Sequence, residues 1–159
     1  TGFAKAIALV VDATDDAIAA LGHIGFSNFQ LHGAETPERV AEIKAMVSGE
    51  VWKALGVATA EDLLVTEAYT AADRLLIDAK PPKGAAMTGG HGAVFDWSLL
   101  KGWRAPKPWM LAGGRTPENV ASAVAATGAP GVDVSSGVEA ARGVKDADKI
   151  TAFIKAVRG

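Results

Sequence analysis

The stretch GVDVSSGVEAARGVKD, residues 131–146, gives the first indication of the fold. Its first valines alternate with small or polar residues and run directly into Ser135, Ser136 and Gly137, which predicts a strand that ends abruptly. Unpaired backbone N–H groups at such an end, followed by the start of a helical turn, favour the binding of a small anion. The stretch therefore predicts a phosphate site in a fold that builds its sites at strand ends.

The composition describes a globular domain and excludes several classes of partner. The 159 residues fit one domain, and 49% of them are apolar, enough for a sizeable core. A net charge of −2, with Lys and Arg scattered among Asp and Glu, predicts neither a nucleic-acid nor a membrane partner. The absence of cysteine excludes a disulfide or thiolate metal site within these residues and favours a cytoplasmic protein.

Short aliphatic segments alternate with amphipathic segments along the whole chain. This alternation is typical of an α/β protein in which a helix follows each parallel strand. A doubly wound dinucleotide-binding fold would carry a glycine-rich turn after the first strand, but LVVDATDDA (9–17) contains no glycine. A (β/α) barrel is therefore favoured. The predicted strands are 5–11, 27–32, 51–57, 73–79, 108–113 and 132–135, and the predicted helices are 15–21, 37–47, 60–71, 96–100, 117–126 and 147–157.

An internal repeat supports the barrel. GAETPERV (33–40) and GGRTPENV (113–120) each place glycine at a strand end before Thr-Pro-Glu. Thr36 and Thr116 suit the N-cap position of a helix, and the proline that follows each of them suits its first turn. Both segments are therefore interpreted as strand-to-helix junctions.

Polar residues follow several of the predicted strands, and a barrel brings all such ends to one mouth. In this fold, the loops after the last two strands are the usual phosphate site. We therefore expect a phosphate site made of Gly113, Gly114, Ser135, Ser136 and Gly137. The remaining residues at the mouth are Gln30, His32, Asp78 and Asp133.

Asp78 is the candidate general acid, because a partly desolvated carboxyl beside a bound sugar can donate a proton. The alternative is a loop cap or an ion pair with Lys80. His32 either acts as a base or orients the substrate and Gln30. No metal is expected, because the three histidines share no ligand spacing. The glycine-rich segment 83–94 is interpreted as a lid.

Five motifs stand in the same order as in the phosphoribosylanthranilate isomerase family of tryptophan biosynthesis, which the chain resembles over essentially its whole length. They are FQLHGAE (29–35), LLIDAK (75–80), FDWSLL (95–100), LAGGRTPENV (111–120) and GVDVSSGVE (131–139). The resemblance implies a (β/α)8 barrel that catalyses an Amadori rearrangement without cofactor or metal. It also implies that Asp78 is the general acid, that the glycines and serines named above bind the phosphate, and that Gln30, His32 and Asp133 lie near the anthranilate and the ribose.

Two departures from the family pattern qualify this expectation. The family's general base is a cysteine in a K-I/V-C-G strand that opens the barrel, and these residues contain neither that strand nor a cysteine. The family commonly has Lys and Thr where Ala93 and Val94 stand here. The chain is therefore expected to be one N-terminally incomplete domain, residues 1–159, which carries strands three to eight and is inactive alone.

Two alternatives remain open at this stage. One is a phosphate-binding fragment that needs a complementing N-terminal segment, and the other is a related phosphosugar barrel such as indole-3-glycerol-phosphate synthase. The expected partner is a phosphorylated sugar-anthranilate, and the protein is expected to be a monomer or homodimer.

Overall fold

Five strands form one parallel sheet in which each strand pairs with the next one along the chain. The computed structural model describes residues 4–79 and 97–159. The strands are β1 (Ala8–Val10), β2 (Phe29–Leu31), β3 (Val51–Val57), β4 (Arg74–Ala79) and β5 (Trp109–Ala112). All their carboxyl ends therefore lie along one edge of the sheet.

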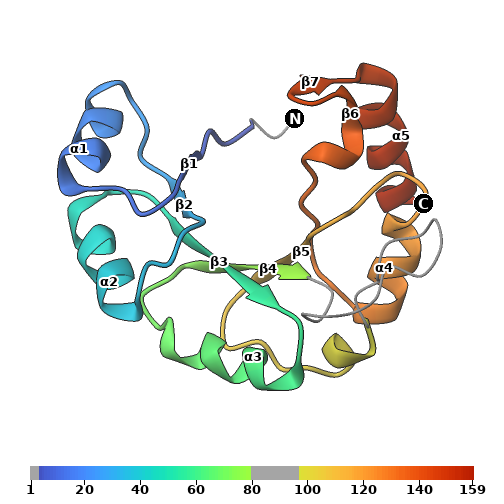
Figure 1. The fold of residues 1–159 in the computed structure, drawn as a ribbon, viewed down its shortest axis with the longest axis horizontal. Coiled ribbons are helices and arrows are strands. Elements are labelled where there is room, and N and C mark those ends of the chain that lie inside the picture. Colours follow the sequence, from blue (N-terminus) through green and yellow to red (C-terminus); the bar gives the residue numbers. More distant parts are fainter. Residues whose placement is uncertain (1–3, 80–96) are drawn as a thin grey trace.

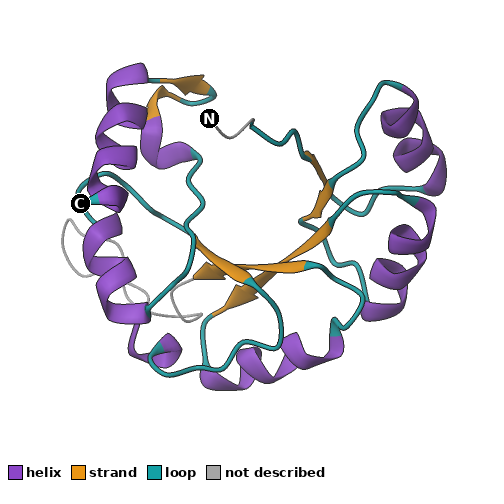
Figure 2. Cartoon of the chain, turned by 180° about the vertical axis from the view of Figure 1, so that it is seen from behind, coloured by secondary structure: helices purple, strands orange, loops and turns teal. Residues whose placement is uncertain are grey.

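Helices follow the strands and cover the convex side of the sheet, so the chain forms an open ring with strands inside and helices outside (Figure 1; Figure 2). The ring is open between β1 and the C-terminal elements. The α-helices are α1 (Asp15–His23), α2 (Pro37–Met46), α3 (Ala60–Leu64), α4 (Val120–Thr127) and α5 (Ala147–Arg158). Three 3-10 turns, η1 (Val65–Ala68), η2 (Trp97–Leu100) and η3 (Ser136–Val138), and an antiparallel pair, β6 (Glu139–Ala141) and β7 (Val144–Lys145), complete the described elements.

The hydrophobic core lies between the sheet and the helices. Phe29 and Leu31 of β2 are fully buried against Val40 and Ile43 of α2. Side chains alternate between the two faces of a strand, so Gln30 and the residues level with it face the inside of the ring. The outer face of the sheet therefore supplies the core, and the inner face is left to line a site.

The predicted strands are confirmed in the sheet with one exception. β3 spans the predicted residues, and the other four are trimmed at their ends. The predicted strand 132–135 is reduced to one parallel bridge between Leu111 and Val132, so six βα units are not confirmed. After this bridge the chain turns into η3, whose Val138 N–H donates to Ser135 O at 3.3 Å, and this turn ends the pairing.

The repeated junction is confirmed in its first copy only. Thr36 caps α2 by accepting a hydrogen bond from the N–H of Arg39. In the second copy the side chain of Asn119 accepts from the Thr116 N–H at 3.0 Å and donates to Gly114 O at 2.9 Å. These bonds hold residues 114–119 in a turn, so the predicted start at Pro117 is wrong: α4 begins at Val120, with Asn119 as its N-cap residue.

A buried ion pair joins the loops that follow β1 and β2. Lys53 is level with Leu31 and Leu75 and therefore faces the helices, not the inside of the ring. Its Nζ lies 2.8 Å from Glu35 Oε2, and both side chains are 2% exposed. Nζ also donates to Gly33 O, and Glu35 accepts from the N–H of Asp12, each at 2.8 Å. The pair therefore fixes two loops at the carboxyl edge of the sheet.

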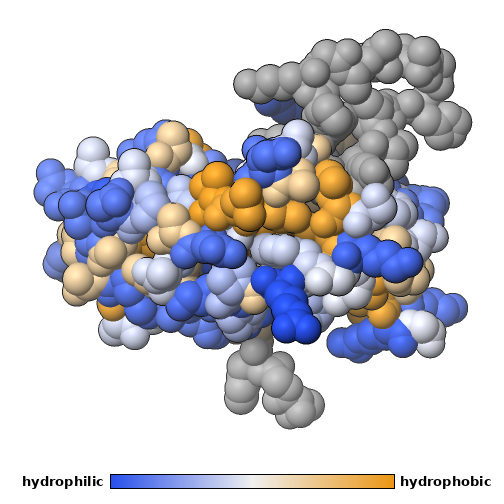
Figure 3. Space-filling view, turned by 90° about the horizontal axis from the view of Figure 1, so that it is seen from below, coloured by the Kyte–Doolittle hydropathy of each residue, from blue (hydrophilic) through white to orange (hydrophobic). Residues whose placement is uncertain are grey.

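The face seen from the side of α3 is mainly hydrophilic, with an apolar patch near its middle (Figure 3). On α3 and η1, Leu64 and Val65 are exposed. Within residues 4–79 and 97–159, no helix has the length and apolar character needed to cross a membrane.

Candidate active site

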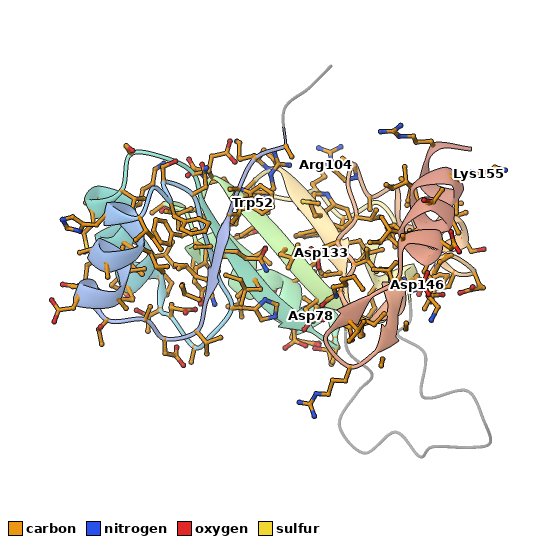
Figure 4. The ribbon with its side chains drawn as sticks, turned by 90° about the horizontal axis from the view of Figure 1, so that it is seen from above. Trp52, Asp78, Arg104, Asp133, Asp146 and Lys155 are labelled. Atoms are coloured by element: carbon orange, nitrogen blue, oxygen red, sulfur yellow. The ribbon has the colours of Figure 1, made fainter. Side chains whose placement is uncertain are left out.

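The carboxyl ends of the strands and the η3 turn enclose a polar cavity of about 190 Å³. In Figure 4, Asp78 lies at one edge of the sheet with Asp133 beside it, and Trp52 lies toward the opposite edge. Of the predicted site residues, all but Gln30 line this cavity: His32, Asp78, Gly113, Gly114, Asp133, Ser135, Ser136 and Gly137. Segments that are distant in the sequence are therefore brought together at one site, as the barrel interpretation requires.

One wall of the cavity is formed by backbone N–H groups. No described residue accepts a hydrogen bond from the N–H of Gly113, Gly114, Arg115, Ser135, Ser136 or Gly137. We call these six residues the cradle. Gly114, Ser135 and Ser136 are exposed, so water can reach their N–H groups, whereas Gly113, Arg115 and Gly137 are buried or half-buried, where an N–H group without an acceptor carries a desolvation cost. A bound anion would satisfy several of them at once.

Glycine is required at both arms of the cradle for steric reasons. Gly113 and Gly114 have φ angles of 83° and 64°, which side chains rarely adopt. At Gly137, a Cβ atom would lie 1.8 Å from Arg115 O, so the two arms touch through their backbones. The close approach of the arms therefore leaves no room for a side chain at Gly137.

Two cations lie at the cradle that the sequence interpretation did not assign to the site. Lys145 donates from Nζ to Ser135 O at 2.9 Å and pairs with Glu139 at 2.7 Å. Arg115 lines the cavity and is 5% exposed. The position of Arg115 directly after Gly113-Gly114 is the sequence feature that could have assigned it to the site. The sequence does not reveal, however, that this arginine is buried.

Asp78 stands at the end of β4 between two strands that carry small residues beside it. Its register partners are Gly56 on β3 and Ala112 on β5. Asp78 and His32 line both the main cavity and a smaller one of about 80 Å³ over the ends of β2 and β3. The carboxyl group therefore lies where two parts of a substrate can meet. The alternative partner Lys80 and the segment 83–94 predicted as a lid lie outside the described residues.

Asp133 is the second carboxyl group of the site. Burial has the largest effect and raises its pKa, the charge of His32 lowers it, the charge of Asp78 raises it by less than that, and the charge of Lys145 lowers it least. The net effect is a raised pKa. A buried carboxyl group with a raised pKa in a polar cavity is typical of sites that handle protons.

Gln30 contacts His32 and does not itself line the cavity. It is 8% exposed and its Nε2 lies 3.2 Å from His32 Nδ1. His32 Nδ1 therefore accepts from the amide, which leaves Nε2 as the ring nitrogen that carries the proton. This arrangement supports the interpretation in which Gln30 and His32 orient one another.

Other parts of the described chain offer weaker candidates. A larger hollow of about 440 Å³ lies at α1 and α2, but His23 is its only titratable residue. In the part of the chain that the structure describes, no group of three or more His, Cys, Asp or Glu residues could hold a metal ion. The polar cavity at the strand ends is therefore the candidate active site.

Fold and site together define an α/β protein with a polar cavity at the carboxyl edge of a parallel sheet. Residues 4–156 match the family described as N-(5'-phosphoribosyl)anthranilate (PRA) isomerase. The chain belongs to this family.

Individual relatives agree with this assignment. The N-(5'-phosphoribosyl)anthranilate isomerase of Hyphomonas neptunium is 57% identical over 157 residues, which are 99% of this chain and 74% of the relative. The crystal structure of phosphoribosyl anthranilate isomerase from Thermotoga maritima has a TM-score of 0.82 at 36% identity, covering 96% of this chain and 72% of that one. A second structure holds a phosphoribosyl anthranilate isomerase in complex with reduced 1-(o-carboxyphenylamino)-1-deoxyribulose 5-phosphate, at a TM-score of 0.76 and 32% identity, covering 96% of this chain and 71% of that one.

Proposed function

We propose that the protein is a phosphoribosylanthranilate isomerase, which converts N-(5'-phosphoribosyl)anthranilate to 1-(2-carboxyphenylamino)-1-deoxyribulose 5-phosphate in tryptophan biosynthesis. The observation that carries this proposal is one cavity with an anion cradle on one wall and a carboxyl group, Asp78, at the end of β4. A sugar phosphate held by the cradle would extend toward Asp78. Family membership supports the same reaction.

Asp78 is the general acid in this proposal. It would protonate the ring oxygen of the ribose as the bond between that oxygen and C1 breaks and the anthranilate nitrogen forms a double bond to C1. A base then removes the proton from C2, and the resulting enolamine rearranges to the ketone. His32 and Asp133 would hold the ribose hydroxyls, with Gln30 fixing the ring of His32. No cofactor or metal takes part in this scheme.

The general base that the family resemblance implies is a cysteine, and the 159 residues contain none. We propose that they supply strands three to eight of a single (β/α)8 domain and need the first two units for catalysis. The chain spans 74% of the length of one relative and 72% of another. In the described chain, β1 pairs only with β2, and its Leu9 is 59% exposed. At the other end of the ring, α5 exposes Ile150 and Ile154.

The other barrel activities are less well supported. Indole-3-glycerol-phosphate synthase would need catalytic lysines at strand ends. Among the described residues, Lys53 is the one buried lysine of the sheet, and it faces the helices. A purely phosphate-binding role would be favoured if completion of the barrel gave no turnover. We expect the complete enzyme to act in the cytoplasm as a monomer or homodimer.

The phosphate site is tested with Gly137→Ala. The new Cβ would lie 1.8 Å from Arg115 O, so the arms must separate. Loss of one charge-assisted hydrogen bond, worth about 1.5 kcal/mol or more, is expected to weaken inorganic phosphate binding about tenfold, measured by calorimetric titration. Gly22→Ala is the control, because its Cβ meets nothing within 4 Å. Equal phosphate affinity of the two variants would contradict the proposed phosphate site. The proposed site would also be contradicted if added phosphate shifted only the NMR signals of amides outside the cradle.

A further inference from the structure

Arg115 is a buried cation without a buried anion. Its side chain is 5% exposed, and its guanidinium carbon lies 5.1 Å from the centre of the Trp97 ring. Within the described residues, no carboxylate lies within ion-pair distance of it, and its Nη1 is buried without a hydrogen-bond acceptor. Burial lowers its pKa, which reflects the cost of keeping the charge away from water.

Such an arrangement is costly unless an anion compensates it. Stacking on an aromatic ring offsets part of the desolvation of a guanidinium group, but it leaves the N–H donors unsatisfied. Buried charges in proteins are usually compensated, so a buried guanidinium group on a residue that lines a ligand cavity points to an anion within range of its charge.

The backbone of Arg115 connects both arms of the cradle. It follows Gly113 and Gly114 directly, and its carbonyl oxygen is the atom against which Gly137 packs. Its Nε donates to Gly113 O at 2.8 Å. A free carbonyl at this turn would repel an anion, and the guanidinium holds that oxygen in a hydrogen bond. The N–H groups of the turn are then the polar groups left for the ligand.

We propose that Arg115 is a phosphate-positioning residue, which supplies fixed positive charge beside the cradle and holds the Gly113–Gly114 turn in its anion-binding conformation. This inference rests on the proposed function, because it deepens the phosphate site of the same cavity. It assigns Arg115 an effect on the affinity for the phosphate group and no contact with the reacting atoms. Lys145 differs from it, because Lys145 is half-exposed and already paired with Glu139.

The test measures inorganic phosphate binding to the 159-residue chain by calorimetry, with folding checked by circular dichroism. Arg115→Met keeps the length and removes the charge, and it is expected to raise the Kd for phosphate about ten- to hundredfold, the range for one or two charge-assisted hydrogen bonds. Arg115→Lys keeps the charge and loses the planar fork, and it is expected to recover part of the affinity. Trp97→Leu removes the stacking partner and is expected to change the Kd less than about threefold, the size of a surface interaction.

The outcomes separate this inference from the proposed function. If the wild-type chain does not bind phosphate, the cradle itself is wrong, and the role of Arg115 falls with it. If the wild-type chain binds and folded Arg115→Met binds with the same Kd, only the role of Arg115 is overturned. A merely structural arginine would lower the melting temperature in Arg115→Met and Arg115→Lys without changing the Kd at a temperature where all variants are folded, and that result also overturns the proposal. Should Arg115→Met not fold, the Kd of Arg115→Lys decides: a wild-type value contradicts the proposal.

Discussion

Asp78→Asn in the complete enzyme is expected to lower turnover by about 10²–10⁴-fold, the usual contribution of a general acid. Asn has nearly the same shape but cannot donate a proton of suitable acidity to the ring oxygen. The cradle that would hold the phosphate lies on β5 and η3, not on β4, so KM is expected to change little. Steady-state kinetics with N-(5'-phosphoribosyl)anthranilate measure both quantities.

A matched substitution controls for the loss of one carboxylate. Asp16 is exposed in the first turn of α1, and Asp16→Asn is expected to leave turnover within about twofold, because surface changes away from the site are small in energy. Retained turnover in Asp78→Asn would show that another group protonates the substrate. A rise in KM with unchanged kcat would instead make Asp78 a binding residue.

The second large effect is expected from Glu35→Gln, which would leave Lys53 buried without its carboxylate. Removing one partner of a buried pair commonly costs about 3–5 kcal/mol, because the remaining charge is uncompensated. Urea unfolding at pH 7 measures the free energy of unfolding. Glu61→Gln, at an exposed position in the first turn of α3, is the control and is expected to cost less than about 0.5 kcal/mol.

The pH dependence gives the same prediction a second readout. Burial acts to raise the pKa of Glu35, but hydrogen bonds from Lys53 and the Asp12 N–H, together with the charge of Lys53, lower it below its ordinary value of 4.5. The ionised carboxylate therefore stabilises the fold above pH 4.5, and this stability is lost as the pH falls through the lowered pKa. Glu35→Gln is expected to lose that part of the pH slope. An unchanged slope together with a loss of stability below about 1 kcal/mol would contradict a stabilising role for the pair.

The sequence predicts most of this fold because its strands are short apolar runs with clear ends. β3 agrees with the prediction at both ends, since Val51–Val57 is flanked by Gly-Glu and by a capped helix start. The strand predicted at 132–135 differs because hydrogen bonding by η3 competes with the ladder, and local periodicity carries no information on that competition. The same limit explains why the capping prediction at Thr116 was wrong: the Asn119 side chain bonds the Thr116 N–H and Gly114 O, and α4 begins only after this turn.

The position of most candidate site residues around one cavity follows from residue type and strand position. Asp78, His32 and the cradle glycines are polar or small residues at strand ends, and a parallel sheet brings such ends to one edge. The role of Lys53 depends on the face of the sheet on which its side chain lies. The role of Arg115 depends on the side of the turn on which its side chain lies. That choice follows from register and packing, so the structure was needed to separate the Lys53–Glu35 pair from the cavity and to place Arg115 within it.

One assay tests the central claim most directly: isomerase activity of the 159-residue chain with and without an N-terminal segment that carries two βα units and the K-I/V-C-G strand. The account predicts no measurable turnover by the chain alone, because loss of the base costs about 10²–10⁴-fold and a 1 Å misplacement about 10²-fold more. It predicts measurable turnover with the segment, and none when the cysteine of the segment is replaced by alanine or when the chain carries Asp78→Asn. Full activity of the chain alone would contradict the account, because the base would then lie within these residues, and a folded but inactive combination would contradict the proposed isomerase function.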